Sequence, residues 1–495
     1  MILDGQGLTA RGVAAVARGG ATVELAAAAR ERNAAAAAAL AELLARGEPV
    51  YGVTTGVGGF RSRELAPAER EGQQLRLLRS HACGAGRLLA PELVRAAMVV
   101  RANQLGAGGA GLSGELLDAL VEAINAGFVP VAHELGSLGT GDLTALAEIA
   151  LALVGEGRAR RGGEPVDAAH ALGELELAAP ALGARDGIAF MSSGAATIGH
   201  AALVAADAER ALDASLRVAA LSFLAAGADP IVLDERVQQA RPHPGQVAVA
   251  ARLRELLGAA PAEPAPGTPI HDPYPFRALP QVEGVTLETL GALDAVLAVE
   301  LNAAAENALI DPAAPAALPG ANFHAGALAL ALDRLRAALA QSASLGAARV
   351  TALLDPGLMG LPAALSPDPG RSSGAMILEY TAHAAAADVR LRASPAAAQT
   401  TTVGGGIESH ASFAPAAARM AEESLYAAGV GVATELVLAV RALRMRGHEP
   451  SGTPAGDLFA RASTRLSADV SDRALNEDIE AARRLLFEGE TPDAG

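Results

Sequence analysis

The sequence predicts an all-α protein built around a bundle of long helices, with only a few short strands. Alanine, leucine, arginine and glutamate fill long stretches of the chain, and these residues have high helix propensity. Strand-like segments are scarce, and the clearest is 157–166, where Gly162-Gly163 suits the turn of a short hairpin. Small alanine side chains let helices approach closely, which favours a bundle of more than one layer.

The expected helices are separated by glycine-rich or proline-rich breaks, and several helices exceed the average globular length. The final one opens with a proline, which suits a first helical position. The expected ranges are 23–46, 70–78, 91–104, 143–153, 195–227, 286–307, 326–354, 376–394 and 415–446. We expect an N-terminal domain over 1–200 and a long-helix bundle with the C-terminal region over 201–495. In such a protein, the polar breaks are where binding and catalytic residues are expected.

Composition excludes several functional classes. The 495 residues carry 55 acidic and 39 basic side chains, for a net charge of −16, and every basic residue is an arginine. Without lysine there is no pyridoxal-phosphate Schiff base and no Walker A loop. An acidic chain without a basic patch is not expected to bind nucleic acid. The single cysteine, Cys83, excludes an intrachain disulfide and a thiolate zinc cluster.

No metal site and no membrane association are expected. The ten histidines form neither H-x-x-x-H nor H-E-x-x-H, so no pair has the spacing of zinc ligands on a helix. The N-terminal residues lack the basic and apolar regions of a signal peptide, and no uninterrupted apolar run reaches about 18 residues. We therefore expect a water-soluble protein in the cytoplasm.

Rare aromatic and charged residues in the breaks are candidates for chemistry. Tyr51 and Tyr274 lie in loop-like segments, where each is either a general base or a half-buried ring with a bonded hydroxyl. Arg277 follows in a proline-flanked segment and suits a carboxylate, although a surface ion pair is the commoner role. Glu408 follows three glycines and could bind an amine or an imidazole, or lie in solvent. In residues 136–143 the pattern is typical of a helix N-terminus with Asp142 as its cap.

Taken together, the breaks resemble the aromatic amino-acid ammonia-lyase and aminomutase family, whose members act on histidine, phenylalanine or tyrosine. The matching motifs occur in family order from Tyr51 to His410. They are Y-G-V-T-T-G-V-G, R-S-H-A-C-G-A-G, R-A-N-Q-L, G-S-L-G-T-G-D-L, R-P-H-P-G-Q, H-D-P-Y-P-F-R-A-L-P-Q, E-L-N-A-A-A-E-N-A-L, G-A-N-F-H and G-G-I-E-S-H.

This resemblance implies a helical subunit of a homotetramer, an active site built from three chains, and an amino-acid-like substrate. It also implies that no external cofactor is needed, because the family makes a methylidene-imidazolone ring from an Ala-Ser-Gly tripeptide of its own chain. By position, Tyr51 resembles the base that removes the β-proton, and Arg277 the group that binds the substrate carboxylate. The other roles implied by position are the prosthetic-group neighbour Tyr274, the ring-reading His81, the aromatic Phe323 beside the electrophile, and the acidic Glu408 facing the amine or imidazole.

The chain departs from the family pattern around the prosthetic group. The pattern G-S-x-G-[AT]-S-G-D-L is one residue short here, and the best ungapped tripeptide is Gly139-Thr140-Gly141. Ser192 stands where the family has an asparagine, and His271 where it has a glutamine. A threonine would leave an ethylidene, and its β-branch crowds ring closure. We therefore predict that the tripeptide stays an ordinary peptide.

The expected function is a carbon–nitrogen lyase similar to the aromatic amino-acid ammonia-lyases, acting on a histidine-like or tyrosine-like substrate. Two alternatives stay open at this point. One is a lyase or isomerase of the same fold that works without the ring. The other is a non-catalytic homologue that binds an amino acid or assists a related subunit.

Overall fold

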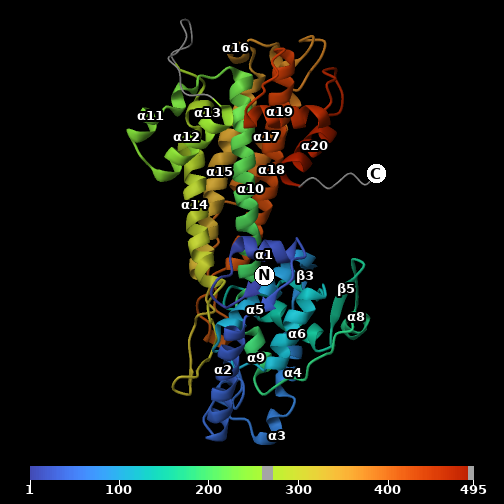
Figure 1. Cartoon of the computed structure of the whole chain (residues 1–495), viewed down its shortest axis with the longest axis vertical. Coiled ribbons are helices and arrows are strands. Elements are labelled where there is room, and N and C mark those ends of the chain that lie inside the picture. Colours follow the sequence, from blue (N-terminus) through green and yellow to red (C-terminus); the bar gives the residue numbers. More distant parts are fainter. Residues whose placement is uncertain (259–270, 489–495) are drawn as a thin grey trace. The chain divides into compact units, whose positions relative to one another are not determined.

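The computed structural model describes residues 1–258 and 271–488, and it confirms the all-α fold with a few short strands (Figure 1). The α-helices are α1 (Ala10–Ala17), α2 (Ala27–Ala45), α3 (Pro67–Arg70), α4 (Gln73–His81), α5 (Pro91–Ala107), α6 (Gly114–Asn125), α7 (Leu143–Leu153), α8 (Ala168–Glu174), α9 (Asp186–Met191), α10 (Ala195–Ala226), α11 (Glu235–Gln239), α12 (Pro244–Leu257), α13 (Tyr274–Arg277), α14 (Leu279–Glu300), α15 (Gly326–Leu354), α16 (Pro356–Met359), α17 (Ile377–Leu391), α18 (Ala414–Met445), α19 (Pro454–Arg465) and α20 (Asn476–Phe487). Single 3-10 turns are η1 (Gly58–Phe60), η2 (Pro230–Leu233), η3 (Ala363–Leu365) and η4 (Gly404–Gly406).

The strands form four two-stranded sheets within the described residues. β1 (Ile2–Leu3) pairs in parallel with β2 (Glu24–Leu25), and β3 (Ala85–Leu88) pairs antiparallel with β4 (His133–Leu135). β7 (Leu309–Asp311) pairs antiparallel with β8 (Ala316–Leu318). β5 (Arg158–Arg161) and β6 (Glu164–Asp167) form the expected hairpin, and Gly162 and Gly163 in its turn both adopt positive φ.

The long helices lie where helix propensity places them, and the differences have local causes. α7 and α15 match their expected ranges end to end. α14 spans Leu279–Glu300 instead of 286–307, because Pro280 suits the start of a helix and residues 301–307 bond to other parts of the chain. α6, α12, α19 and α20 are helices that the sequence pattern alone did not indicate.

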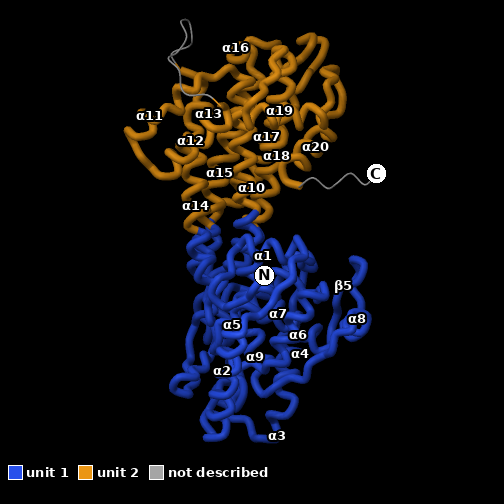
Figure 2. The backbone as a smooth tube through the Cα atoms, viewed as in Figure 1, with its two compact units in different colours: residues 1–206, 293–332, 395–419 blue, residues 207–292, 333–394, 420–495 orange. Residues whose placement is uncertain are grey.

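The chain divides into two compact units (Figure 2). Unit 1 comprises residues 1–206, 293–332 and 395–419, and unit 2 comprises 207–292, 333–394 and 420–495. Four of the five division points lie inside α10, α14, α15 and α18, and the fifth follows α17, so each unit is assembled from separate stretches of sequence. The functional division after residue 200 stays a prediction.

Two helical stretches, Asp186–Ala226 and Ala414–Met445, are long and apolar enough to cross a membrane by composition alone. Their most apolar windows are 94% and 72% buried within the fold. Buried core helices have the same composition, so packing accounts for these stretches without a membrane.

Within unit 2, α10, α15, α17, α18 and α19 pack around one apolar core that includes Leu221, Val350 and Leu436. This core contains a buried ionic cluster. Arg349 donates from Nε and Nη2 to the two carboxylate oxygens of Glu435 at 2.7 and 2.9 Å. Glu283 on α14 is fully buried, and its Oε1 accepts from the Ser342 hydroxyl at 2.8 Å.

The cluster contains two carboxyl groups but one guanidinium, and both carboxylate oxygens of Glu435 already accept hydrogen bonds from that guanidinium. Glu283 Oε2 has no hydrogen-bond partner within the described residues. Burial therefore raises the pKa of Glu283, and the attraction of Arg349 offsets this only in part. A neutral Glu283 is the form that this core favours.

Glu283→Gln is expected to make the protein more stable than the wild type at alkaline pH. The raised pKa of Glu283 means that the folded chain keeps a proton which the unfolded chain loses, so stability falls as pH rises from the unfolded toward the folded pKa. The steepest loss is about 1.4 kcal/mol per pH unit for one proton. Because the amide does not ionise, the free energy of unfolding of the variant, measured in urea, should not show this decrease as pH rises. The matched control is Glu235→Gln on the exposed face of α11, which should follow the wild type, and parallel pH profiles for all three proteins would contradict the prediction.

Candidate active site

Unit 1 contains a cavity of about 550 Å³ that gathers most of the predicted site residues. It is bounded by the Tyr51 loop, the end of α4, the loop between β4 and α7, and four positions later in the chain, near residues 188–192, 307, 323 and 408. The predicted residues in its wall are Tyr51, His81, Thr140, Gly141, Ser192, Phe323 and Glu408. Three further wall residues, Phe60, Arg63 and Asn307, were not expected from the sequence.

Buried polar side chains of α5, from the R-A-N-Q-L motif, hold the irregular segments around the cavity. Arg101 is fully buried, pairs with Glu306 at 2.8 Å and donates from Nε to the Phe190 carbonyl at 3.1 Å. Gln104 accepts from the Ser193 hydroxyl at 2.6 Å and donates to the Glu300 carbonyl at 2.9 Å. These bonds fix the chain on both sides of Ser192 and ahead of Asn307.

A second buried arginine supports the same region. Arg185 Nη2 donates to the Ala308 carbonyl at 2.6 Å, and Nη1 donates to the Ala110 carbonyl. Burial lowers the pKa of Arg185 to about 10, although nearby Glu306 opposes the change. The residue therefore stays cationic at neutral pH. Arg185 gave no signal in the sequence because its partners are backbone carbonyls.

The tripeptide loop is tightly bonded at Gly139. This residue has φ +83°, and a Cβ built on it would lie 2.0 Å from Ser412 Oγ. Ser412 Oγ donates to the Gly139 carbonyl at 2.9 Å, and Ala325 N donates to the same oxygen at 3.3 Å. Only glycine fits this position without displacing a neighbour.

Thr140 projects into the cavity and contacts the predicted acidic residue. Its hydroxyl donates to Glu408 Oε2 at 2.8 Å, joining side chains that are 268 residues apart in the sequence. Glu408 also exchanges backbone hydrogen bonds with Val403, on the other side of the η4 turn. The carboxylate is therefore held at the cavity wall, which excludes the alternative in which it lies free in solvent.

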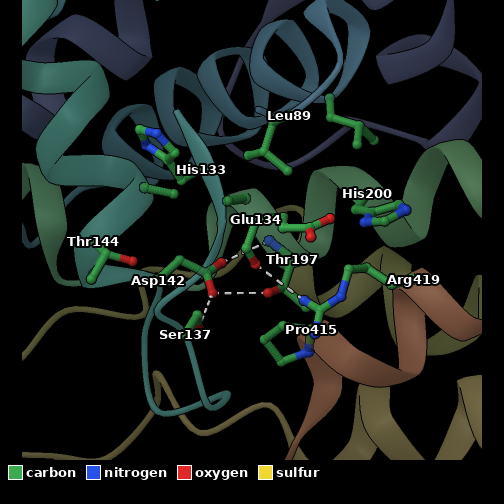
Figure 3. Close-up of a pocket in the computed structure, with 13 residues that line it drawn as sticks. Leu89, His133, Glu134, Ser137, Asp142, Thr144, Thr197, His200, Pro415 and Arg419 are labelled. Carbon is green, nitrogen blue, oxygen red and sulfur yellow. Dashed lines mark hydrogen bonds between the residues drawn. The ribbon is translucent and has the colours of Figure 1, made fainter. Parts of the chain in front are cut away.

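Asp142 anchors the loop in a small second pocket, where its side chain points toward Ser137 and Thr197 (Figure 3). Its carboxylate accepts from Ser137 Oγ at 2.5 Å, Thr197 N at 2.7 Å and Thr197 Oγ1 at 2.8 Å. Although it occupies the N-cap position of α7, its side chain makes no capping bond there, contrary to our expectation. It instead binds the first turn of α10, where the N–H groups lack helical partners. Burial raises the pKa of Asp142, and the hydrogen bonds oppose this.

The Tyr51 loop folds back on itself through glycines. The Tyr51 hydroxyl oxygen accepts from Gly58 N at 2.9 Å. Gly56 is essential to this turn, because a Cβ there would lie 2.5 Å from the Phe60 carbonyl oxygen. A backbone donor aimed at the phenol oxygen stabilises negative charge on it, which is what a phenolate base requires.

His81 ends α4 with a defined hydrogen-bond arrangement. Its Nδ1 lies 2.8 Å from the Leu77 carbonyl oxygen, which can only accept, so Nδ1 carries a proton. In the neutral ring, Nε2 is then an acceptor. Ser192 contributes less, since its hydroxyl reaches the Asn307 carbonyl only at 3.4 Å.

The remaining predicted residues, His271, Tyr274 and Arg277, belong to unit 2 and are not part of this cavity wall. Phe276 is buried edge-to-face against Phe223, with ring centroids 5.4 Å apart, and so anchors the short helix α13. Arg277 lies over the Tyr274 ring at 5.8 Å from its centroid, and its Nε has no hydrogen-bond partner in the described part of unit 2. Tyr274 itself is 67% exposed.

A sequence model for aromatic amino acid lyases matches residues 8–464. The chain belongs to the aromatic amino acid lyase family. This lyase is 37% identical to a histidine ammonia-lyase of Symbiobacterium thermophilum, over 98% of this chain and 96% of the relative. The match covers the whole set of loops that build the cavity, so the carbon–nitrogen lyase class and the amino-acid type of substrate apply to this chain.

Solved structures give the same fold. The lyase superposes with a TM-score of 0.93 on ergothionase, an ergothioneine-degrading enzyme of Treponema denticola, at 27% identity and covering 98% of both chains. It superposes with a TM-score of 0.91 on the histidine ammonia-lyase of Trypanosoma cruzi, at 30% identity, covering 98% of this chain and 92% of the other. The ergothionase structure contains desmethyl-ergothioneine sulfonic acid.

Gly139→Ala is expected to destabilise unit 1 of the lyase by about 1–3 kcal/mol, because a side chain at φ +83° is strained and its Cβ would meet Ser412 Oγ. Urea unfolding of the purified protein measures the change. Gly405→Ala is the matched control, because Gly405 also has positive φ (+68°) but a Cβ added there would meet no atom within 4 Å. Equal losses in the two variants would show that strain alone, without the Ser412 contact, determines the effect.

Proposed function

We propose that this lyase eliminates a quaternary amine from an imidazole-bearing amino acid, without a methylidene-imidazolone ring. The observation that carries the proposal is the tripeptide loop, in which Gly139 accepts no side chain and a single residue, Thr140, separates it from Gly141. The proposal selects the ring-independent lyase from the alternatives that the sequence left open.

The residues of the loop do not fit the family's prosthetic group. Because a Cβ at position 139 would clash with Ser412 Oγ, Gly139 corresponds to the glycine before the family tripeptide, and Thr140 to its first residue. No residue is then left for the serine that supplies the methylidene carbon. The Thr140 hydroxyl is also bonded to Glu408, whose carboxylate gives it no assistance as a leaving group. The proposed reaction therefore does not use a methylidene-imidazolone ring.

The leaving group decides whether an electrophile is needed. A primary ammonium carries N–H protons that are more acidic than the β-carbon protons, so a base neutralises the nitrogen before it can break the C–H bond. A quaternary ammonium has no such proton and departs as a neutral amine. The missing serine therefore favours a substrate that already carries a good leaving group at Cα.

The cavity wall suits a quaternary ammonium. The whole chain has only nine phenylalanines, four tyrosines and no tryptophan, yet Tyr51, Phe60 and Phe323 all line this one cavity. Aromatic faces and a carboxylate are the groups that bind methylated ammonium ions, and Glu408 supplies the carboxylate. Ergothioneine, named for the similar ergothionase structure, is a trimethylammonium derivative of 2-thiohistidine and belongs to this class.

The imidazole part of the proposal rests on His81 and on the relatives. His81 Nε2 is the acceptor end of its ring, so it can receive an N–H from a substrate imidazole. The relative from Symbiobacterium thermophilum is named as a histidine ammonia-lyase.

Tyr51 is the proposed base. Its oxygen takes the β-proton, the C–H electron pair forms the Cα–Cβ double bond, and the Cα–N bond breaks to release trimethylamine. The products are an unsaturated carboxylate, the neutral amine and one proton, so the reaction needs no oxidant and no external cofactor. Gly58 N, at 2.9 Å from the Tyr51 oxygen, is oriented to stabilise the phenolate before it takes the proton.

Arg277 is the proposed partner of the substrate carboxylate, with Tyr274 and His271 beside it. The family resemblance implies an active site built from three chains, and we propose that these residues reach the cavity of another subunit in a cytoplasmic homotetramer. Large apolar side chains exposed on α14 and α15, Val299 at 67% and Leu330 at 65%, are consistent with such an assembly.

The peptide spanning residues 136–143 is expected to have the mass of its unmodified sequence, because ring formation would remove two waters. In the same preparation, ergothioneine or histidine trimethylbetaine should release trimethylamine, and histidine should release no ammonia above background. A deficit of two waters with ammonia release would overturn the ring-independent proposal. Insertion of a serine between Thr140 and Gly141 is the matched variant, since it restores the family tripeptide.

Arg277→Lys is expected to raise the Kd of the betaine substrate by about 30- to 150-fold, which corresponds to about 2–3 kcal/mol for a charge-assisted bond that is lost. Lysine keeps the charge but not the bidentate fork, so unchanged binding would assign Arg277 to a surface ion pair. Arg236→Lys, at an exposed ion pair of unit 2, is the control. Activity restored by mixing Arg277→Met and Tyr51→Phe subunits would place the two residues in sites shared between chains.

A further inference from the structure

Three segments far apart in the sequence meet at one wall of the cavity. They are the tripeptide loop at 136–143, the Phe323 segment at 320–325 and the Glu408 segment at 403–413. Ala325 N donates to the Gly139 carbonyl at 3.3 Å, and Phe413 N donates to the Leu138 carbonyl at 2.9 Å. The second and third segments are thus each bonded to the first through the backbone.

A pair of histidines joins the Phe323 and Glu408 segments directly. His324 Nε2 and His410 Nδ1 lie 2.9 Å apart, and the ring centroids are 5.1 Å apart at an interplanar angle of 41°. His324 is the residue after Phe323, and His410 lies two residues after Glu408. One of the two nitrogens carries the proton and the other accepts it.

The histidine pair closes a ring of contacts around Thr140. The backbone of Thr140 pairs with that of His324 in an antiparallel bridge, and the Thr140 hydroxyl donates to Glu408 at 2.8 Å. From Glu408 the chain leads to His410, and from His410 the side-chain bond returns to His324. Each of these contacts constrains the position of the Glu408 carboxylate.

Glu408 needs such a constraint because the chain before it is intrinsically flexible. Gly404, Gly405 and Gly406 precede it with φ of +63°, +68° and +93°. Glycine has the largest backbone freedom of any residue, so on this side of the segment the carboxylate is restrained by the two backbone hydrogen bonds between Val403 and Glu408. A fixed point on the other side of Glu408 adds a second restraint on its orientation.

The absence of a side chain at Gly326 leaves space for the His324 ring. Gly326, the first residue of α15, lies under the ring, and a Cβ there would be 3.0 Å from His324 Cε1 and 3.2 Å from Nδ1. Gly326 has an ordinary helical position and is not required by a positive φ. The absence of a side chain at this position lets the imidazole adopt the orientation that reaches His410.

We propose that His324 and His410 are positioning residues, whose mutual hydrogen bond holds the Glu408 carboxylate against Thr140 in the orientation that receives the cationic group of the substrate. The identity of that cationic group rests on the proposed function, whereas the positioning itself does not. Neither histidine lies in the cavity wall, so each acts through Glu408 and not by touching the substrate.

Hydrogen–deuterium exchange of the full-length protein tests the positioning without any ligand. His324→Ala and His410→Ala should each raise the exchange rates of the Val403 and Glu408 amides by about fivefold, as expected for one lost hydrogen bond. His410→Asn places an amide near the Nδ1 position, and His324→Gln places one near Nε2, so both should restore slow exchange. Gly326→Ala, which displaces the ring and keeps both histidines, should resemble the alanine variants. His448→Ala, an exposed histidine of unit 2, is the control.

The second measurement is the Kd of histidine trimethylbetaine. His410→Ala should raise the Kd by about fivefold in the wild-type background, and should have no further effect when Glu408 is already glutamine. Unchanged exchange rates in both alanine variants would overturn the positioning role, whatever the protein binds. An equal effect of His410→Ala with and without Glu408 would likewise overturn it, by showing a general structural role. Faster exchange in the variants with no betaine binding by the wild type would uphold the positioning and refute the proposed substrate.

Discussion

The fully buried side chain of Arg101 is the constraint on which the architecture of unit 1 depends. Irregular chain cannot be buried unless its backbone groups find partners, and much of the cavity wall of this lyase is irregular chain. Arg101 binds the Phe190 carbonyl and the carboxylate of Glu306, while its helix neighbours Asn103 and Gln104 bind the carbonyls at the end of α14. Polar side chains of α5 thus fix the position of loops that have no regular structure of their own. Removal of Arg101 would leave the buried Glu306 carboxylate without its directly bonded guanidinium, the more damaging half of breaking such a pair.

The tripeptide loop at the cavity wall is likewise held in place by bonds to distant parts of the chain. Gly139 and Thr140 bond to the 403–413 segment and Asp142 bonds to Thr197 at the start of α10, so three segments of the chain meet at this loop. A loop held at so many points can lose a residue and keep its neighbours in register. A tripeptide shorter than the family pattern is therefore compatible with a cavity wall that includes Tyr51, Phe323 and Glu408.

Helix propensity and motif order were sufficient to predict the fold class, the long helices and the grouping of Tyr51, Thr140, Phe323 and Glu408. The ends of α14 were wrong because tertiary bonds at Glu306 and Asn103 overrode the helical pattern of residues 301–307. The bonding of Asp142 was wrong because a cap is a local rule, and Thr197 lies 55 residues away. The roles of Arg101, Arg185 and the histidine pair could not be read from one sequence, since their partners are carbonyls and a second histidine in distant segments. The motif R-A-N-Q-L contains Arg101, and G-A-N-F-H and G-G-I-E-S-H contain the two histidines, but none of the quoted motifs contains Arg185.

The discontinuity of unit 1 has a consequence for how the chain is made. Its last segment ends at residue 419, and the contacts of Gly139 and Thr140 with the 403–413 segment cannot form until that part has been synthesised. At about 5–20 residues per second, a ribosome takes on the order of half a minute to extend the chain from Thr140 to Glu408. Throughout that interval, the glycine-rich loops and the apolar faces of the first 206 residues lack their final partners. Early helices such as α1, α2 and α5 can pack during synthesis, but closure of the cavity is a late event, so production of the active enzyme depends on protecting a long nascent intermediate from aggregation.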